Sequence, residues 1–275
     1  MYLVSGATGN AGREVVRALL DQGAAVRALV RSADTPLPDG VERAVGDLDR
    51  PESVRPWLDG VDGIFGLPGY SGTATILAEA DRAGVRRLVQ LSGVSAGSGD
   101  RSNAITRYMI DSEDLARTCG LSWTIVRPSM FASNALSWRD QLRQGDVVTA
   151  AFGAVATAVI DPADIGAVVA AALTDDRHAG RTYRISGPEA TRPADRVAVL
   201  GEVLGRDLRF VAQPDDVARR EMAATMPKPY VDAFFDFYVD GSLDESPVLP
   251  TVAEITGRQP HSFRDWAVRN AGRFG

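Results

Sequence analysis

The chain begins Met1-Tyr2-Leu3-Val4-Ser5 and continues directly with Gly6-Ala7-Thr8-Gly9-Asn10-Ala11-Gly12. An apolar strand thus runs straight into three glycines spaced three residues apart, and an amphipathic stretch over 13–22 follows. This arrangement is typical of the turn that binds a dinucleotide. Gly6 permits a tight turn, Gly9 lets the backbone approach the diphosphate, and Gly12 lets the helix pack closely on the sheet. A glycine triplet alone also fits an ordinary strand-to-helix turn, but its strand, loop and helix context favours the dinucleotide.

Strands and helices are predicted to alternate through the first half of the chain. Apolar runs predict strands over 2–5, 25–31, 42–45, 63–67, 87–92 and 122–127. Amphipathic segments predict helices over 10–22, 51–59, 72–83 and 104–118. Several strands are continuous apolar runs, as expected when helices cover both faces of a sheet. The predicted fold class is therefore α/β, a doubly wound parallel sheet of the Rossmann type.

The alternation becomes irregular after Pro128. We expect a short strand over 147–151, a helix over 162–174 and another strand over 181–185. Four further helices are expected at about 192–204, 215–225, 228–239 and 262–272. Residues 1–128 are thus predicted to form the nucleotide-binding core. Residues 129–275 are predicted to form mainly a smaller, largely helical substrate lobe over the carboxyl edge of the sheet, with 159–186 returning to the core.

The composition restricts the classes of partner. The 275 residues are 45% hydrophobic and 24% charged, which is ordinary for a globular protein. A formal net charge of -6 without any basic block argues against nucleic acid. The single cysteine, Cys119, excludes an internal disulfide and fits a reducing cytoplasm. With no leader sequence or membrane-spanning apolar run, we expect neither export nor insertion, and a small molecule as the ligand.

Further motifs follow the predicted strands. They are Leu29-Val30-Arg31, Gly46-Asp47-Leu48, Leu91-Ser92-Gly93, the stretch from Gly120 to Pro128, and the stretch from Val159 to Gly166. Together with the opening glycines, they resemble the NmrA-like, NAD(P)-binding group of atypical short-chain dehydrogenases. That group includes quinone reductases, ketone reductases of aromatic polyketide pathways and non-catalytic redox sensors.

The resemblance implies positions around a cofactor. Gly6 to Gly12 would hold the diphosphate, and Asp47 and Leu48 would border the adenine. Leu67 and Pro68 would flank the cofactor where the fourth strand ends. Ser92, Gly93, Pro128 and Ser129 would lie beside the nicotinamide. All of these residue types are also common in ordinary loops.

Arg31 bears on which cofactor is used. In this fold, the end of the second strand carries an acidic residue when the ribose of NAD is bound, whereas a guanidinium pairs with the 2'-phosphate of NADP. Arg31 occupies that position, and Ser32 follows it. We therefore expect NADPH to be preferred over NADH. Asp34 could still turn toward a ribose, with Arg31 as a solvated charge.

The usual acid of short-chain dehydrogenases is incomplete in this chain. Those enzymes use a tyrosine and, four residues later on the helix after the fifth strand, a lysine that lowers the pKa of the tyrosine. The only lysine here is Lys228. On the corresponding helix, Ser112 stands four residues after Tyr108, and Glu113 stands four after Met109. We expect Met109 to face the nicotinamide, Tyr108 to be a half-buried aromatic residue, and Glu113 either to bond a ribose or to face water.

Two functional hypotheses fit this incomplete acid. One is a reductase for a flat aromatic ketone or quinone, whose developing charge delocalises toward a phenolate-like oxygen with a pKa of about 10. The Ser92 hydroxyl and the Ser95 N–H would then polarise the carbonyl. The other is a redox sensor without turnover, in which cofactor binding alters a surface that a partner reads. The oligomeric state is not predicted.

Aromatic residues in the second lobe are candidates for substrate contacts. Phe234 and Tyr238 recur at helical spacing in Tyr230-Val-Asp-Ala-Phe-Phe-Asp-Phe-Tyr238. They would either fill the core or form a lid over a flat substrate. Phe131, Asn134 and Trp138 would form the opposite wall, next to Met109. No metal site is expected, because His178 and His261 lack neighbouring ligands.

Overall fold

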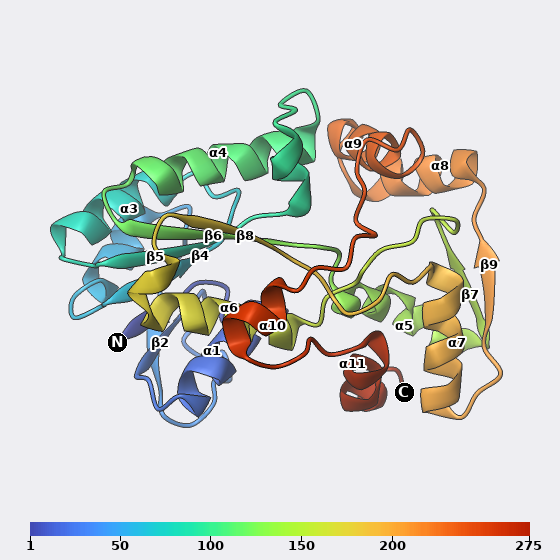
Figure 1. Cartoon of the computed structure of the whole chain (residues 1–275), viewed down its shortest axis with the longest axis horizontal. Helices are drawn as coiled ribbons and strands as arrows, with labels where there is room; N and C mark the ends of the chain where they lie inside the picture. Colours follow the sequence, from blue (N-terminus) through green and yellow to red (C-terminus); the bar gives the residue numbers. More distant parts are fainter.

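The computed structural model describes residues 1–275 and has two lobes (Figure 1). Seven parallel strands form the sheet of the first lobe in the order β3-β2-β1-β4-β5-β6-β8. Their bounds are β1 (Tyr2–Val4), β2 (Val26–Val30), β3 (Val41–Val45), β4 (Gly63–Gly66), β5 (Arg87–Leu91), β6 (Ser122–Pro128) and β8 (Arg181–Ile185). The reversal of strand order between β1 and β4 is the doubly wound arrangement, so the predicted fold class is confirmed.

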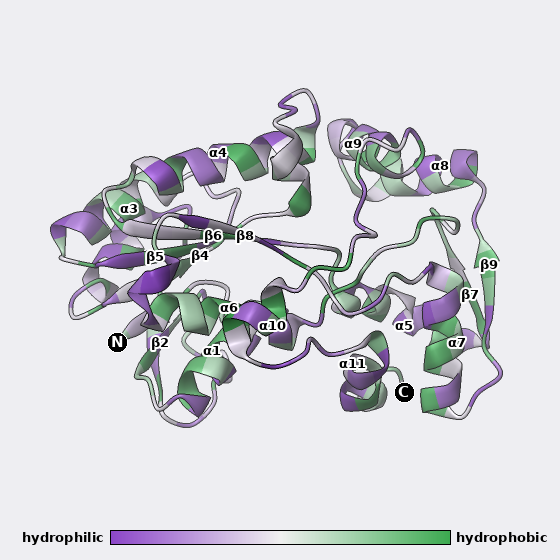
Figure 2. Cartoon of the chain, viewed as in Figure 1, coloured by the Kyte–Doolittle hydropathy of each residue, from purple (hydrophilic) through white to green (hydrophobic).

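Helices cover both faces of this sheet. One face carries α1 (Gly12–Asp21) and α6 (Pro162–Thr174), and the other carries α2 (Pro51–Val54), α3 (Thr73–Arg82) and α4 (Ala104–Thr118). The helix α6 is apolar around most of its circumference (Figure 2), because it packs against α1, the sheet and α10 (Thr251–Thr256). A Cβ atom on Gly166 of α6 would lie 2.5 Å from the backbone of Glu14, so glycine allows the two helices to approach.

The second lobe is built around a two-stranded parallel sheet of β7 (Val147–Ala150) and β9 (Arg209–Ala212). Its core joins Trp138, Leu200, Phe263 and Trp266. The surrounding helices are α5 (Arg139–Gln144), α7 (Pro193–Leu204), α8 (Asp215–Thr225), α9 (Lys228–Tyr238) and α11 (Phe263–Asn270). The predicted helices and the strand at 147–151 are present, whereas β9, α5 and α10 are short elements that the sequence pattern does not predict.

Ionic contacts link α6 to the carboxyl-terminal segment. The N-cap Asp161 accepts a hydrogen bond from Ala163 N at 2.8 Å and also pairs with Arg269. Asp164 is fully buried and bonds His261, whose backbone N and Nδ1 each lie 2.7 Å from its carboxylate oxygens. The segment that joins α9 to α11 therefore lies against the first lobe. None of the helices has the length and apolar character needed to cross a lipid bilayer.

Candidate cofactor and substrate site

The turn between β1 and α1 has no room for side chains at two of its glycines. Gly6 has a φ of +58°, a left-handed conformation that favours glycine, and a Cβ there would lie 2.5 Å from Leu67 Cδ1. A Cβ on Gly12 would lie 2.1 Å from the carbonyl oxygen of Gly6. The turn therefore folds back on itself against Leu67, at the end of β4.

This turn contains main-chain donors that have no partner in the chain. The N–H groups of Asn10, Ala11 and Gly12 make no backbone hydrogen bond, and α1 has no side-chain cap at Ala11. Thr8, Gly9 and Asn10 are exposed. A helix start with free N–H groups and no acidic cap favours a bound anion. These residues fit the diphosphate of a dinucleotide, with Gly9 leaving the backbone open to it.

Arg31 directly follows β2 and is exposed, with no ion pair or hydrogen bond inside the chain. Its guanidinium is free to pair with a ligand. The Ser32 hydroxyl accepts a hydrogen bond from the backbone N of Asp34 at 3.3 Å. Arg43 donates a hydrogen bond to the carbonyl oxygen of Thr35 in the same loop at 2.6 Å. The loop is thus ordered by local contacts that leave Arg31 unengaged.

Two other loops are tied together beside the glycine turn. Asp47 accepts from Asp49 N at 3.0 Å, and Asp49 accepts from both the N–H and the hydroxyl of Ser71 at 2.8 Å. A Cβ on Gly72 would lie 2.1 Å from the carbonyl oxygen of Leu48, so these loops are in direct contact. The structure therefore brings Asp47 and Leu48 to the same edge of the sheet as Gly6 and Arg31.

Residues of the helix α4 contact the ends of two different strands. Met109 contacts Gly93, since a Cβ there would lie 3.5 Å from Met109 Cε. Tyr108 lies instead against Gly69, and Ser112 Oγ accepts from Gly69 N at 3.2 Å while donating to the carbonyl of Tyr108. Tyr108 nevertheless lines the same cavity as Met109, and burial raises the pKa of its phenol.

Glu113 is at the centre of a buried ionic network. Its carboxylate accepts from the Ser92 hydroxyl at 2.5 Å, from Arg127 at 2.7 and 2.6 Å, and from Arg117 at 2.7 Å. The expectation that Glu113 bonds a ribose or faces water is wrong, because the side chain is only 1% exposed. Burial acts to raise the pKa of Glu113, but hydrogen bonds from Arg127, Ser92 and Arg117 outweigh it and hold the pKa below its usual range.

The same network changes the role expected for Ser92. Its hydroxyl hydrogen is donated to Glu113, and its backbone N is bonded to the carbonyl of Val126 at 2.8 Å. Ser92 therefore cannot donate to a substrate carbonyl as expected. Val94 and Ser95 begin a 3-10 helix over Val94–Ser98, and their N–H groups make no backbone hydrogen bond. They are free donors at this strand end, as is the backbone N–H of Gly93.

A cavity of about 610 Å³ lies where β5 and β6 end, and we call it the strand-end cavity. Its floor includes Pro68, Ser92, Gly93, Ser95 and Pro128, and α4 contributes Met109 and Tyr108. Aromatic residues of α9 close the far side. Asn103 fixes that helix, because its side chain caps α4 and donates to Ala233 O at 3.2 Å and to Asp236 at 2.8 Å.

The aromatic residues of α9 divide between core and cavity. Phe235 is buried in the core, whereas Tyr230, Phe234, Phe237 and Tyr238 line the strand-end cavity. Phe131 and Asn134 line it as well, but Trp138 does not and instead lines a second, adjoining cavity. The sequence did not single out Glu245, which lines the strand-end cavity and accepts from the Tyr238 hydroxyl at 2.8 Å. Burial raises the pKa of Glu245.

The Rossmann sheet, the open glycine turn and the cavity beside it together define a dinucleotide-binding protein. A family model described as NAD(P)H-binding matches residues 6–176. The chain is 40% identical over 280 residues to a (4-alkanoyl-5-oxo-2,5-dihydrofuran-3-yl)methyl phosphate reductase of Streptomyces griseus, covering 100% of this chain and 99% of that protein. It is 32% identical over 285 residues to an NAD(P)H azoreductase of Xenophilus azovorans, with the same coverage.

Solved structures share the fold across nearly the whole chain. The NADPH-dependent quinone oxidoreductase QOR2 of Escherichia coli superposes with a TM-score of 0.77 at 20% identity, covering 99% of this chain and 100% of that one. A triphenylmethane reductase of Citrobacter gives 0.79 at 20% identity, covering 98% of each. The chain belongs to the NAD(P)H-binding family and is an NAD(P)H-dependent oxidoreductase, and it shares its fold with the NmrA structure at a TM-score of 0.75 and 16% identity.

Proposed function

We propose that this protein uses NADPH to reduce a flat, conjugated carbonyl acceptor, an aromatic ketone or a quinone, by direct hydride transfer. NADPH, when bound, supplies the hydride. Gly6, Gly9 and Gly12 would hold its diphosphate and Arg31 its 2'-phosphate. The acceptor would lie in the strand-end cavity beside Gly93 and Met109.

The observation that carries this proposal is the identity of the residues on α4. No ammonium group lies near Tyr108, because the only lysine, Lys228, is exposed and paired with Asp232 at 2.5 Å. Ser112 and Glu113 are both bonded to protein groups. Without a nearby cation, a buried phenol keeps its proton at neutral pH. An acceptor whose developing charge is delocalised fits such a site better than a simple ketone does.

The other residues of the cavity would polarise the carbonyl group of the acceptor and would not act as a strong acid. The free N–H groups of Val94 and Ser95 would donate to the acceptor oxygen as negative charge develops on it. The apolar residues Met109, Phe131 and Phe234 would exclude water from the ring and strengthen those hydrogen bonds. Water would then deliver the proton to the oxyanion formed, which is phenolate-like when the acceptor is a quinone.

Two of the relatives support an activated acceptor. The name of the Streptomyces griseus protein describes a furanone ring that carries an acyl group, and the Xenophilus azovorans protein is named for azo compounds. Both names describe acceptors in which a double bond is conjugated or activated. We extend that property, and not the individual substrates, to this chain.

A panel assay tests the proposal. The protein is mixed with NADPH and a set of quinones, polycyclic ketones and conjugated furanones, and the absorbance of the reduced nicotinamide is followed. We expect oxidation well above the enzyme-free rate with at least one conjugated acceptor and little with simple aliphatic ketones. Tight binding of both oxidised and reduced cofactor with no oxidation of NADPH by any acceptor would instead indicate a sensor.

A further inference from the structure

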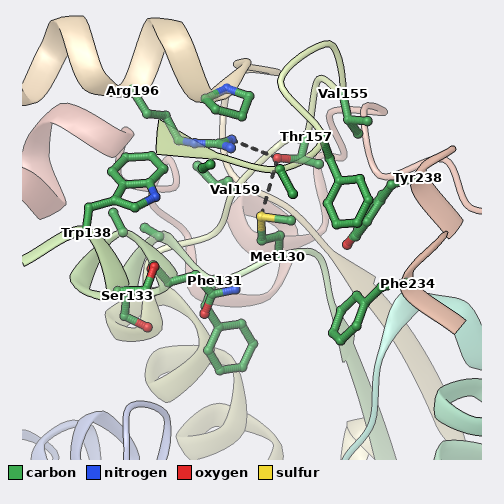
Figure 3. Close-up of a pocket in the computed structure, with 18 of the residues that line it drawn as sticks. Met130, Phe131, Ser133, Trp138, Val155, Thr157, Val159, Arg196, Phe234 and Tyr238 are labelled. Atoms are coloured by element: carbon green, nitrogen blue, oxygen red, sulfur yellow. Dashed lines mark hydrogen bonds between the residues drawn. The ribbon is translucent and has the colours of Figure 1, made fainter. Parts of the chain in front are cut away.

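The second cavity, which we call the arginine cavity, has a volume of about 570 Å³ and adjoins the strand-end cavity. Six residues line both cavities: Met130, Phe131, Asn134, Met226, Phe234 and Tyr238. Most of the arginine cavity is apolar, and Arg196 of α7 is the one charged residue on its wall. Figure 3 shows the guanidinium of Arg196 beside Thr157, with Trp138 and Tyr238 on the surrounding walls.

Arg196 is buried without a carboxylate partner. It is 6% exposed, and its Nη1 donates to Thr157 Oγ1 and to the carbonyl of Thr191, both at 2.9 Å. Its Nε and Nη2 have no hydrogen-bond partner in the chain, and it forms no ion pair. The nearest acidic groups are engaged elsewhere, since Asp195 bonds Arg192 N and Glu245 bonds Tyr238.

A buried cation without a counterion is costly, so an arginine in this position requires a compensating role. Burial lowers the pKa of Arg196 to about 10, which still leaves it charged at neutral pH. Two further features belong to residues that line the same cavity. The hydroxyl of Ser133 is buried and unpartnered, and Phe152 adopts a φ of 58°, which is strained for a bulky residue.

We propose that the arginine cavity binds an anionic group, a carboxylate, sulfonate or phosphate, carried by the molecule whose conjugated ring occupies the strand-end cavity. This inference rests on the proposed reductase function. The free Nε and Nη2 of Arg196 form the fork that pairs with two oxygens of such a group. The shared wall of Phe131, Phe234 and Met226 would contact the stem between ring and anion. The substrate is thus a conjugated acceptor with an acidic substituent.

Binding of two matched dyes tests the site without requiring turnover. Anilinonaphthalene sulfonate carries the anion, and N-phenylnaphthylamine is its uncharged counterpart. In Arg196→Gln we expect the Kd of the sulfonate to rise at least about tenfold, the usual loss of a charged hydrogen bond, while that of the neutral dye changes less than about threefold. Arg196→Lys keeps the charge but not the two-donor fork, so it should recover only part of the loss. Arg192→Gln, an exposed arginine at the start of the same helix, should leave both values unchanged.

Either of two results would overturn the proposal. Unchanged binding of the sulfonate in Arg196→Gln would mean that the guanidinium only ties Thr157 to Thr191. An equal loss of both dyes would mean that Arg196 shapes the cavity without recognising charge. Retained binding of the neutral dye also shows that the variant is folded.

Turnover separates this inference from the proposed function. Wild type should reduce a naphthoquinone sulfonate with a higher kcat/KM than the uncharged naphthoquinone, and Arg196→Gln should lose that preference by at least about tenfold. If neither quinone is reduced while the dye pattern holds, the proposed function fails and the anion site stands. If both are reduced equally by wild type and variant, the anion site fails and the reductase stands.

Discussion

The hydroxyl of Ser92 lies 2.5 Å from the carboxylate of Glu113, which connects the end of β5 to the middle of α4. Arg127, on β6, donates two hydrogen bonds to the same carboxylate. Three elements that border the strand-end cavity are therefore held by one buried acid. Glu113, four residues after Met109 on α4, is thus a buried anion that joins these three elements.

Glu113→Gln should lower the free energy of unfolding by about 2–3 kcal/mol at neutral pH, because it leaves Arg127 and Arg117 without their buried partner. Denaturant unfolding at neutral pH measures this difference. Asp111→Asn, on the exposed side of the same helix, is the control and should cost less than about 1 kcal/mol. Equal costs for the two variants would contradict the network's structural role.

The difference between wild type and Glu113→Gln should also depend on pH. The pKa of Glu113 in the folded protein lies below its ordinary value of 4.5, so the unfolded chain takes up this proton first as the pH falls. The stabilising contribution of the carboxylate is complete above pH 4.5 and is lost as the pH falls through the lower, folded value. Unfolding curves of the two proteins should therefore converge in acid, whereas a gap that widens there would contradict the assignment.

The sequence predicted the sheet and most helices because their strands are apolar runs between turn residues and their helices carry an amphipathic pattern. It did not predict β9, where Arg209, Val211 and Ala212 are exposed and no alternation appears. Nor did it predict α10, which has only six residues between Pro250 and Gly257. Elements this short are stabilised by contacts with distant segments, and the local sequence does not encode those contacts.

The candidate site was predictable where it depends on backbone conformation. The glycine spacing at Gly6 to Gly12 indicated the turn, because its conformation and packing exclude side chains. The ion pairs of Glu113 were not predictable from the sequence. Arg127 lies on another element, and Arg117, four residues after Glu113, has the spacing of an ordinary ion pair on a helix surface. Trp138 was placed in the wrong cavity because the 3-10 helix over Ala132–Trp138 directs successive residues to different walls.

Gly12→Ala should abolish cofactor binding and destabilise the first lobe. Its Cβ would lie 2.1 Å from the Gly6 carbonyl oxygen, so the turn must move, at a cost of about 1–3 kcal/mol. Calorimetric titration with NADPH and thermal unfolding measure the two effects. Gly145→Ala is a matched control, because nothing lies within 4 Å of a Cβ there and its backbone is extended. Full NADPH affinity in Gly12→Ala would refute the placement of the diphosphate.

Arg31→Asp should reduce kcat/KM for NADPH by about 10- to 100-fold, which is the usual effect of losing a hydrogen bond to a charged group. The same substitution should change kcat/KM for NADH much less. The measurement is the ratio of the two values with one acceptor. Arg209→Asp makes the same change of charge on β9, in the second lobe, and should leave the ratio unchanged. An unaltered ratio in Arg31→Asp would remove Arg31 from the cofactor site.

Tyr108→Phe should keep turnover within about tenfold of wild type, whereas removal of a general acid typically costs about 100-fold or more. The phenol of Tyr108 faces the cavity with a raised pKa and no neighbouring cation, so it is a poor acid here. Steady-state kcat with the best acceptor of the panel measures the effect. A collapse of kcat would show that Tyr108 delivers the proton.

The most direct test of the account is a single-turnover reaction without oxygen, in which protein in excess over NADPH is mixed with the best acceptor. We predict that all bound NADPH is oxidised in one exponential phase, with one acceptor molecule reduced for each cofactor and a rate far above that of the enzyme-free mixture. Bound NADPH whose nicotinamide absorbance stays constant with every acceptor would contradict the assignment as a reductase.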